Sequence, residues 1–214
     1  MKKIIFILPV LLLLCSCAET VNIIENYKLA NIDYKKIKEG KITFAGTRHI
    51  SLSEFQKTFK DVYSDTTILN KKLYDCIVED FKKYKLNAQI ISDTKNIPEE
   101  LFSEGKVHTE DVKKVKEYFL NCKSDYVLVI KNFEIDHNYE YSGPKTGSQE
   151  ICVVNITFAF WDVANQNKII SATASGKGRV VLWSFSTALN TALENAMENA
   201  IIYVSKNGTP EFQH

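Results

Sequence analysis

The amino terminus constrains this chain most, because it decides which residues reach the folded protein. The chain starts with Met1-Lys2-Lys3 and continues with an apolar run from Ile4 to Leu14, interrupted only by Pro9. This run of 11 residues is too short to cross a bilayer core, which needs about 20 residues. A positive start before a short apolar segment is instead typical of a secretory signal peptide, which is removed from the mature protein.

The segment Leu14-Cys15-Ser16-Cys17 ends the apolar run and has a small residue directly before Cys17. It resembles the bacterial lipobox. The resemblance implies transfer of a diacylglyceryl group to the Cys17 sulfur, cleavage before this residue and, in many bacteria, a further N-acyl chain. The reaction needs a thiolate as its nucleophile. Two alternatives stay open: a plain signal peptide with two incidental cysteines, or Cys15 as the acceptor, which the bulky Leu14 before it disfavours.

The lipid anchor predicts where the protein resides. Two or more acyl chains attach a protein stably to a membrane, whereas one chain does so only marginally. We therefore expect a lipid-anchored protein of the cell envelope. Ala18 follows the cysteine, and in enteric bacteria an Asp at this position marks retention in the inner membrane. By this resemblance Ala18 permits the periplasmic face of the outer membrane in a Gram-negative source, and the argument does not apply to a cell with one membrane.

Composition sets the domain organisation and excludes one class of partner. Cleavage before Cys17 removes two lysines from the chain, so the formal net charge changes from +1 to −1. A near-neutral chain has no electrostatic footprint for nucleic acid. At 45% hydrophobic residues the chain can bury a real core. We predict a signal peptide at 1–16, a polar tether at 17–38, one domain at 39–208 and a tail at 209–214.

Hydrophobic periodicity predicts a single α/β (α+β) domain with a mixed sheet of about five strands and helices packed on it. A strand, a helix and a second strand open the domain, which predicts a parallel pair with a right-handed crossover. Ser51 with Glu54 matches a capping box and predicts a helix start. The expected strands are 41–46, 86–92, 125–130, 150–163 and 168–181. The expected helices are 52–62, 66–84, 109–121 and a last helix that Ser184 or Ser186 caps and Asn207-Gly208 ends. Within the tether, Ile23, Ile24 and Tyr27 could dock on the domain.

Three cysteines remain in the mature chain besides the lipidation site, namely Cys76, Cys122 and Cys152. A disulfide framework normally shows an even count. All three cysteines fit apolar positions, where a free Cys behaves as a small hydrophobic residue. We therefore expect no disulfide, although one bridge is compatible with the count.

The common catalytic motifs are absent from the sequence, and we predict neither catalytic residues nor a cofactor. The segment 143–148 lacks the Gly-Lys-Ser/Thr step of a phosphate-binding loop and reads as a hairpin turn. No Gly-x-Ser-x-Gly elbow occurs. The glycines of Gly176-Lys177-Gly178-Arg179 lie in a strand pattern, which favours a bulge or close packing over phosphate binding.

Histidines and aromatic residues supply the remaining candidates. Asp136, His137 and Glu140 form the best polar cluster, but alternate strand residues share a face, so His137 lies apart from the two carboxylates. We predict a solvated strand end there and no metal site. Arg48 and His49 follow the first expected strand, at the end where open α/β sheets bind ligands. They are candidate ligand contacts, and Trp183, at a strand-to-helix corner, is a candidate partner contact.

The later part of the chain carries a family resemblance. Phe160-Trp161-Asp162-Val163, a polar turn, Lys168-Ile169-Ile170 and an Ala-rich helix follow one another. This order resembles lipoproteins related to the curli secretion-channel lipoprotein, penicillin-binding-protein activator lipoproteins and the amino-terminal domain of the Tol-Pal propeller protein. The resemblance implies a mixed sheet and a role in assembly or partner binding, with no catalytic residues. A curli-type pore is not expected, because the sequence shows no long amphipathic membrane hairpin.

Three functional hypotheses follow. The first is a non-enzymatic envelope lipoprotein that is held to the membrane by its lipid, binds a protein partner in envelope assembly or maintenance and can form a homo-oligomer. The second is a module that binds a small molecule or a cell-wall fragment. The third is an envelope hydrolase built around Asp136 and His137. A pocket of convergent polar groups would favour the second hypothesis, and a flat exposed apolar patch around Trp183 would favour the first.

Overall fold

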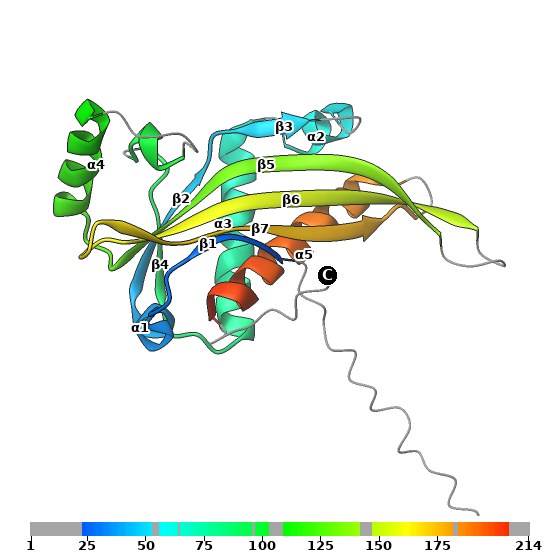
Figure 1. Cartoon of the computed structure of the whole chain (residues 1–214). Coiled ribbons are helices and arrows are strands. Elements are labelled where there is room, and N and C mark those ends of the chain that lie inside the picture. The colour runs from blue at the N-terminus through cyan, green and yellow to red at the C-terminus, as the bar shows by residue number, and fades with distance from the viewer. Residues whose placement is uncertain are drawn as a thin grey trace, which may run out of the picture.

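The computed structural model describes residues 23–52, 56–63, 65–95, 97–102, 109–141, 147–181 and 184–205. Within these ranges the chain forms one seven-stranded sheet with helices packed on it (Figure 1). The elements in chain order are β1 Ile23–Lys28, α1 Tyr34–Glu39, β2 Lys41–Thr47, β3 Ile50–Leu52, α2 Gln56–Val62, α3 Thr66–Lys83, β4 Gln89–Ser92, the 3₁₀ turn η2 Glu99–Leu101, α4 Thr109–Asn121, β5 Tyr126–Tyr141, β6 Ser148–Asp162, β7 Asn167–Arg179 and α5 Phe185–Ser205.

The predicted fold class is confirmed: the sheet is mixed and belongs to a single α+β domain. The strand order is β1-β7-β6-β5-β2-β4, and β3 pairs with β5 outside this path. Strand β2 runs parallel to both β4 and β5, whereas β5, β6 and β7 form an antiparallel meander. The five predicted strands are all present, and β1 and β3 are additional to them.

The prediction of a polar tether at 17–38 needs correction for its described part. Residues Ile23–Lys28 form β1, which pairs antiparallel with the outer side of β7. Residues Tyr34–Glu39 form α1, in which the Asp33 carboxylate accepts from the Lys36 backbone N–H at 3.1 Å. Backbone pairing explains why a polar segment becomes a strand, because edge strands need few buried side chains once a neighbour satisfies their N–H and C=O groups.

The helix start predicted at Ser51 is also wrong. Ser51 lies in β3, which pairs parallel with the middle of β5, and α2 begins only at Gln56. The pairing of β2 with β5 shifts register between Phe44 and Thr47, where Gly46 has φ +77°. After this irregularity the long β5 continues and still offers backbone groups on that side, which β3 then satisfies.

The main core lies between one face of the sheet and helices α3 and α5. Phe44, Phe133 and Phe158 from the sheet are fully buried there, together with Leu73 of α3 and Leu193 of α5. A smaller second core lies on the opposite face, where α4 and η2 cover only one end of the sheet through residues that include Phe119 and Leu101. The rest of that second face carries hydrogen-bonded polar side chains, such as Thr157 with Thr173 at 2.9 Å.

Strands β5 and β6 are the longest of the sheet and extend beyond the helices as a two-stranded projection, at the end of the molecule opposite α4 (Figure 1). We call residues 136–141 and 148–153 the arm; they include this projection and its base, where residues 151–153 still pair with β7. The pairing is regular throughout it, from Asp136 with Val153 to Tyr141 with Ser148. None of the helices in the described ranges is both long and apolar enough to span a membrane.

Candidate functional site

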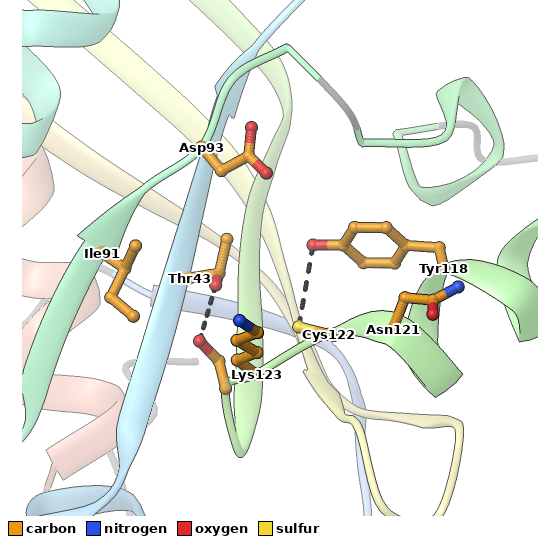
Figure 2. A pocket seen from close by; sticks show the side chains of 8 residues that line it. Thr43, Ile91, Asp93, Tyr118, Asn121, Cys122 and Lys123 are labelled. Atoms are coloured by element: carbon orange, nitrogen blue, oxygen red, sulfur yellow. Dashed lines mark hydrogen bonds between the residues drawn. The ribbon is translucent and has the colours of Figure 1, made fainter.

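A pocket of about 390 Å³ lies between the β2–β4 side of the sheet and the end of α4 (Figure 2). Its lining mixes hydroxyl, carboxylate, amide, thiol and ammonium groups with one apolar wall residue. The lining residues are Thr43, Ile91, Asp93, Tyr118, Asn121, Cys122, Lys123 and Ser124.

The pocket exists because α4 covers only part of the second sheet face. Phe119 of α4 packs on Trp161 of β6, with 6.0 Å between their ring centroids. Strand alternation turns Ile42 and Phe44 into the main core, so Thr43 between them faces the opposite side. On that side Thr43 pairs with Ile91 of the edge strand β4, which is 36% exposed. The uncovered strip of β2 and β4 therefore forms the floor of the pocket.

Hydrogen bonds order the polar groups of the pocket. The Thr43 and Ser124 hydroxyls lie 2.7 Å apart, and both residues are buried. The Cys122 thiol donates weakly to the Tyr118 hydroxyl at 4.0 Å, and the Tyr118 ring extends from α4 toward β2 (Figure 2). Burial, aided by the neighbouring Cys122 and Asp93, raises the pKa of Tyr118. Its phenol therefore stays protonated and can donate a hydrogen bond to a ligand.

Arg48 has a structural position instead of lining the pocket. Its guanidinium forms an ion pair with Glu99, donates to the Ile97 carbonyl oxygen at 3.0 Å and lies 4.7 Å from the centroid of the Phe102 ring. These contacts fasten segment 97–102 to the end of β2. His49 is exposed, and its carbonyl oxygen accepts from the Phe133 N–H at 3.1 Å. A ligand contact at Arg48 or His49 stays a prediction.

Cys17 and Trp183 lie outside the described residues. The polar cluster on β5 is described, and its members separate as strand alternation predicts. Asp136 is exposed, whereas His137 Nε2 lies 2.6 Å from Glu150 Oε1 on the neighbouring strand. Glu140 instead pairs with Lys177 at 3.0 Å. The described part of the chain contains no group of three or more His, Cys, Asp and Glu side chains that could hold a metal ion.

The three remaining cysteines are free thiols that differ in accessibility. Cys76 and Cys152 are buried, and Cys122 is partly exposed in the pocket. Burial raises the pKa of Cys76 and of Cys152 to about 12. Because thiolates and not thiols react, these two groups are inert at neutral pH.

The carboxyl group of Asp80, which lies outside the pocket between α3 and α5, also has a shifted pKa. Asp80 of α3 has a buried Oδ2 that lacks a hydrogen-bond partner among the described residues. Glu198 of α5 lies close to it and is itself held by Lys83 and Tyr84. Burial is the main cause that raises the pKa of Asp80 to about 7, and the negative charge of Glu198 adds to it, whereas Lys83 acts in the opposite direction. Asp80 therefore changes its charge near neutral pH.

Sequence reasoning missed the pocket because its residues come from three separate segments. Only the parallel pairing of β2 with β4 and β5 brings Thr43 beside Ile91 and Ser124. The one available signal was the polar Thr43 between two core residues in an otherwise apolar strand, which marks an uncovered position on the second face.

A scan against protein-family models found no match, and a search of the curated proteins found none either. Several solved structures are similar in shape. The PelC dodecamer from Paraburkholderia phytofirmans matches with a TM-score of 0.40 and 15% identity over 84% of this chain and 96% of that one. The hypothetical protein CT253 from Chlamydia trachomatis gives 0.47 and 8% identity over 78% and 98%.

Lipoprotein GNA1162 from Neisseria meningitidis gives a TM-score of 0.34 and 13% identity over 76% of this chain and 98% of that one. All three scores lie below 0.5, and these likenesses assign no function to this chain.

Proposed function

We propose that this protein is a non-enzymatic lipoprotein of the cell envelope, anchored through Cys17, that binds a protein partner in envelope assembly or maintenance. The observation that carries the proposal is the segment Leu14-Cys15-Ser16-Cys17, with its acceptor cysteine six residues before the first strand at Ile23. Such a short connection suits a domain that works at a membrane surface. In a Gram-negative source the periplasmic face of the outer membrane is the favoured location.

The hydroxyl and thiol groups of the pocket contact one another and the Tyr118 phenol. Its two hydroxyl groups, on Thr43 and Ser124, bond to each other, and no histidine is among the lining residues. An activated hydroxyl nucleophile needs a base within hydrogen-bond reach. The Cys122 thiol likewise contacts a phenol that stays protonated, and not a base.

The anchor is tested in a Gram-negative host that expresses the full chain with a C-terminal tag. Cells are grown with an alkyne analogue of palmitate, and the purified chain is checked for the label and for its membrane fraction. We expect label in the wild type and in Cys15→Ala, and none in Cys17→Ala. Label that persists in Cys17→Ala and disappears in Cys15→Ala would move the acceptor to Cys15, and label in none of the three chains would contradict the anchor.

The partner is tested by crosslinking in the same intact cells. An envelope protein that is crosslinked to the wild type and lost in Cys17→Ala supports a tethered partner-binding protein. A chain that is labelled with lipid but crosslinks to nothing argues against the partner and leaves the anchor standing.

The pocket favours one alternative, a module that binds a small polar molecule or a cell-wall fragment. Convergent hydrogen-bonding groups around an apolar wall are typical of ligand sites. Alkylation of Cys122 provides the assay, because Cys122 is partly exposed in the pocket whereas Cys76 and Cys152 are buried. Soluble muropeptides that slow alkylation of Cys122 by N-ethylmaleimide in the wild type, but less so in Tyr118→Phe, would support this alternative. Equal alkylation with and without muropeptides would contradict it for this ligand class.

A further inference from the structure

The arm reaches far beyond the point at which the chain enters the sheet. In the strand register, Ile23 of β1 pairs with Ala174, Ala174 with Ile156, and Ile156 with Phe133 of β5. Tyr141, the last residue of β5, lies eight positions past Phe133. At about 3.3 Å per strand residue, the arm extends roughly 26 Å beyond the start of β1.

The chain enters the sheet from the side of the arm. Strand β7 runs toward the arm, where Arg179 at its end pairs with Ile151. Strand β1 is antiparallel to β7, so the chain enters β1 from the arm side. Cys17 precedes Ile23 by six residues, and six residues span at most about 22 Å even when fully extended. The arm is therefore longer than the connection to the lipid.

The lengths of the connection and of the arm restrict how an anchored domain can be oriented on its membrane. A lipid on Cys17 fixes that residue at the membrane surface. With a connection shorter than the projection, the domain cannot be held upright with its arm clear of the bilayer. When the arm side of the domain faces the bilayer, the arm therefore reaches the headgroup region or lies along it.

The two faces of the arm differ in chemistry. Tyr139 and Tyr141 share one face, and each is 67% exposed. Beside them His137 pairs with Glu150, and the Tyr139 ring lies 5.0 Å from the imidazole. The other face carries Asp136 and Glu140, the latter paired with Lys177. Tyrosine combines an apolar ring with a polar tip and is enriched where proteins meet the membrane–water interface.

We propose that the arm lies against the lipid surface that holds Cys17, with the face of Tyr139 and Tyr141 in the headgroup region. This inference rests on the proposed lipid anchor. Residues 136–141 and 148–153 include three carboxylates and neither lysine nor arginine, so the proposed contact depends on the tyrosine rings and does not require anionic lipid. The contact is therefore expected in vesicles of zwitterionic lipid and should be insensitive to salt, which screens only charge interactions.

The test uses the full lipidated chain with Cys122→Ser, because Cys76 and Cys152 are buried and Cys17 is blocked by lipid. A single new cysteine is introduced by Tyr139→Cys and labelled with the environment-sensitive nitrobenzoxadiazole fluorophore. The chain is reconstituted in phosphatidylcholine vesicles, and flotation establishes that it is anchored. We expect a blue-shifted emission that is quenched by headgroup spin-labelled lipid, at both low and high salt.

Two matched positions serve as controls. Leu120 is 75% exposed and belongs to α4, which lies at the end of the molecule opposite the arm (Figure 1). Ile24 of β1 is 65% exposed and follows Cys17 by seven residues. Ile24 pairs with Thr173 and so lies on the sheet face opposite the tyrosines. Labels introduced by Leu120→Cys and Ile24→Cys should keep the emission they show in water.

The other possible outcomes distinguish failure of the arm contact from failure of the lipid anchor. Vesicles that float with the protein, but with the label at position 139 as exposed as that at position 120, would overturn the inference and leave the anchor intact. Shielding at position 24 instead of 139 would mean that the other face lies down, and also overturns it. Shielding that needs added envelope proteins would identify a protein partner for the arm in place of lipid. Failure to float would contradict the anchor itself.

Discussion

The backbone of Gly176 in β7 lies directly against the carbonyl of Ala192 in α5. A Cβ atom at position 176 would lie 2.0 Å from the Ala192 oxygen, and one at Gly178 would lie 1.9 Å from that of Ala188. Side chains of α5 also bond to the same strand, because Asn195 donates to the Lys177 carbonyl oxygen at 2.8 Å. Helix α5 thus packs on β7 at backbone contact, which explains the two glycines without a phosphate.

The first prediction is that Gly176→Ala destabilises the domain strongly. The added methyl group meets helix backbone, which cannot rotate away, so α5 must shift and loosen the main core. Overpacking of a core typically costs about 1–3 kcal/mol, and we expect the upper part of this range or more. Urea unfolding followed by circular dichroism measures the change.

The control for this prediction lies between the two glycines. Lys177 is exposed, and its ammonium pairs with the half-exposed Glu140. Lys177→Ala should lower the free energy of unfolding by no more than about 0.5 kcal/mol. Equal losses in Gly176→Ala and Lys177→Ala would show that α5 does not press on β7.

Periodicity predicted the elements that bury a continuous stripe or face. Helix α5 and the meander of β5, β6 and β7 are long and strongly patterned, so their burial outweighs local propensity. Helix α3 also starts at residue 66 as predicted, and the Asp65 carboxylate caps it by accepting from the Thr67 N–H at 2.7 Å. Such features are local, and a sequence pattern therefore records them.

Strands β1 and β3 and the pocket could not be predicted in this way. Strand β1 is held by backbone pairing to β7, which lies far away in the sequence, as the pairing of Ile23 with Ala174 illustrates. Strand β3 depends on where β2 leaves β5. The pocket depends on where α4 stops covering the sheet. These features follow from long-range pairing and coverage, which leave no periodic signal in the segments themselves.

The second prediction concerns the pH dependence of stability. The folded protein raises the pKa of Asp80 to about 7, above the usual value near 4. Between these two pH values the folded state binds more protons than the unfolded state. The contribution of Asp80 to the free energy of unfolding is therefore fully present below about pH 4 and is lost as the pH rises through 7. Asp80→Asn should therefore be more stable than the wild type at pH 8, by about 1–2 kcal/mol after allowance for solvent screening.

Thermal unfolding at pH 5 and pH 8 checks this prediction. The stability difference between Asp80→Asn and the wild type should be larger at pH 8 than at pH 5. Asp75 is exposed on the same helix, and Asp75→Asn should show little change at either pH. A difference for Asp80→Asn that is the same at both pH values would contradict titration of Asp80 in this range.

The third prediction concerns the irregularity in β2. The Asn70 side chain of α3 accepts from the buried Thr47 N–H at 2.7 Å, next to Gly46 with its positive φ. Asn70→Ala leaves this N–H without its acceptor, which costs about 1–3 kcal/mol. Asn70→Asp keeps the acceptor and should retain more stability than Asn70→Ala in the same urea titration. The reverse order would show that the bond does not support the strand.

The last prediction concerns the hydrogen bond between the two hydroxyl groups of the pocket. Thr43 and Ser124 bond at 2.7 Å, and both are buried, so Thr43→Val leaves the Ser124 hydroxyl without its partner at an expected cost of about 1–3 kcal/mol. Adding Ser124→Ala removes the orphaned hydroxyl, and the double variant should recover part of that loss. A double-mutant cycle in urea measures the coupling between the two positions. Losses that simply add would mean that the two hydroxyls do not depend on each other and are free to bond a ligand instead.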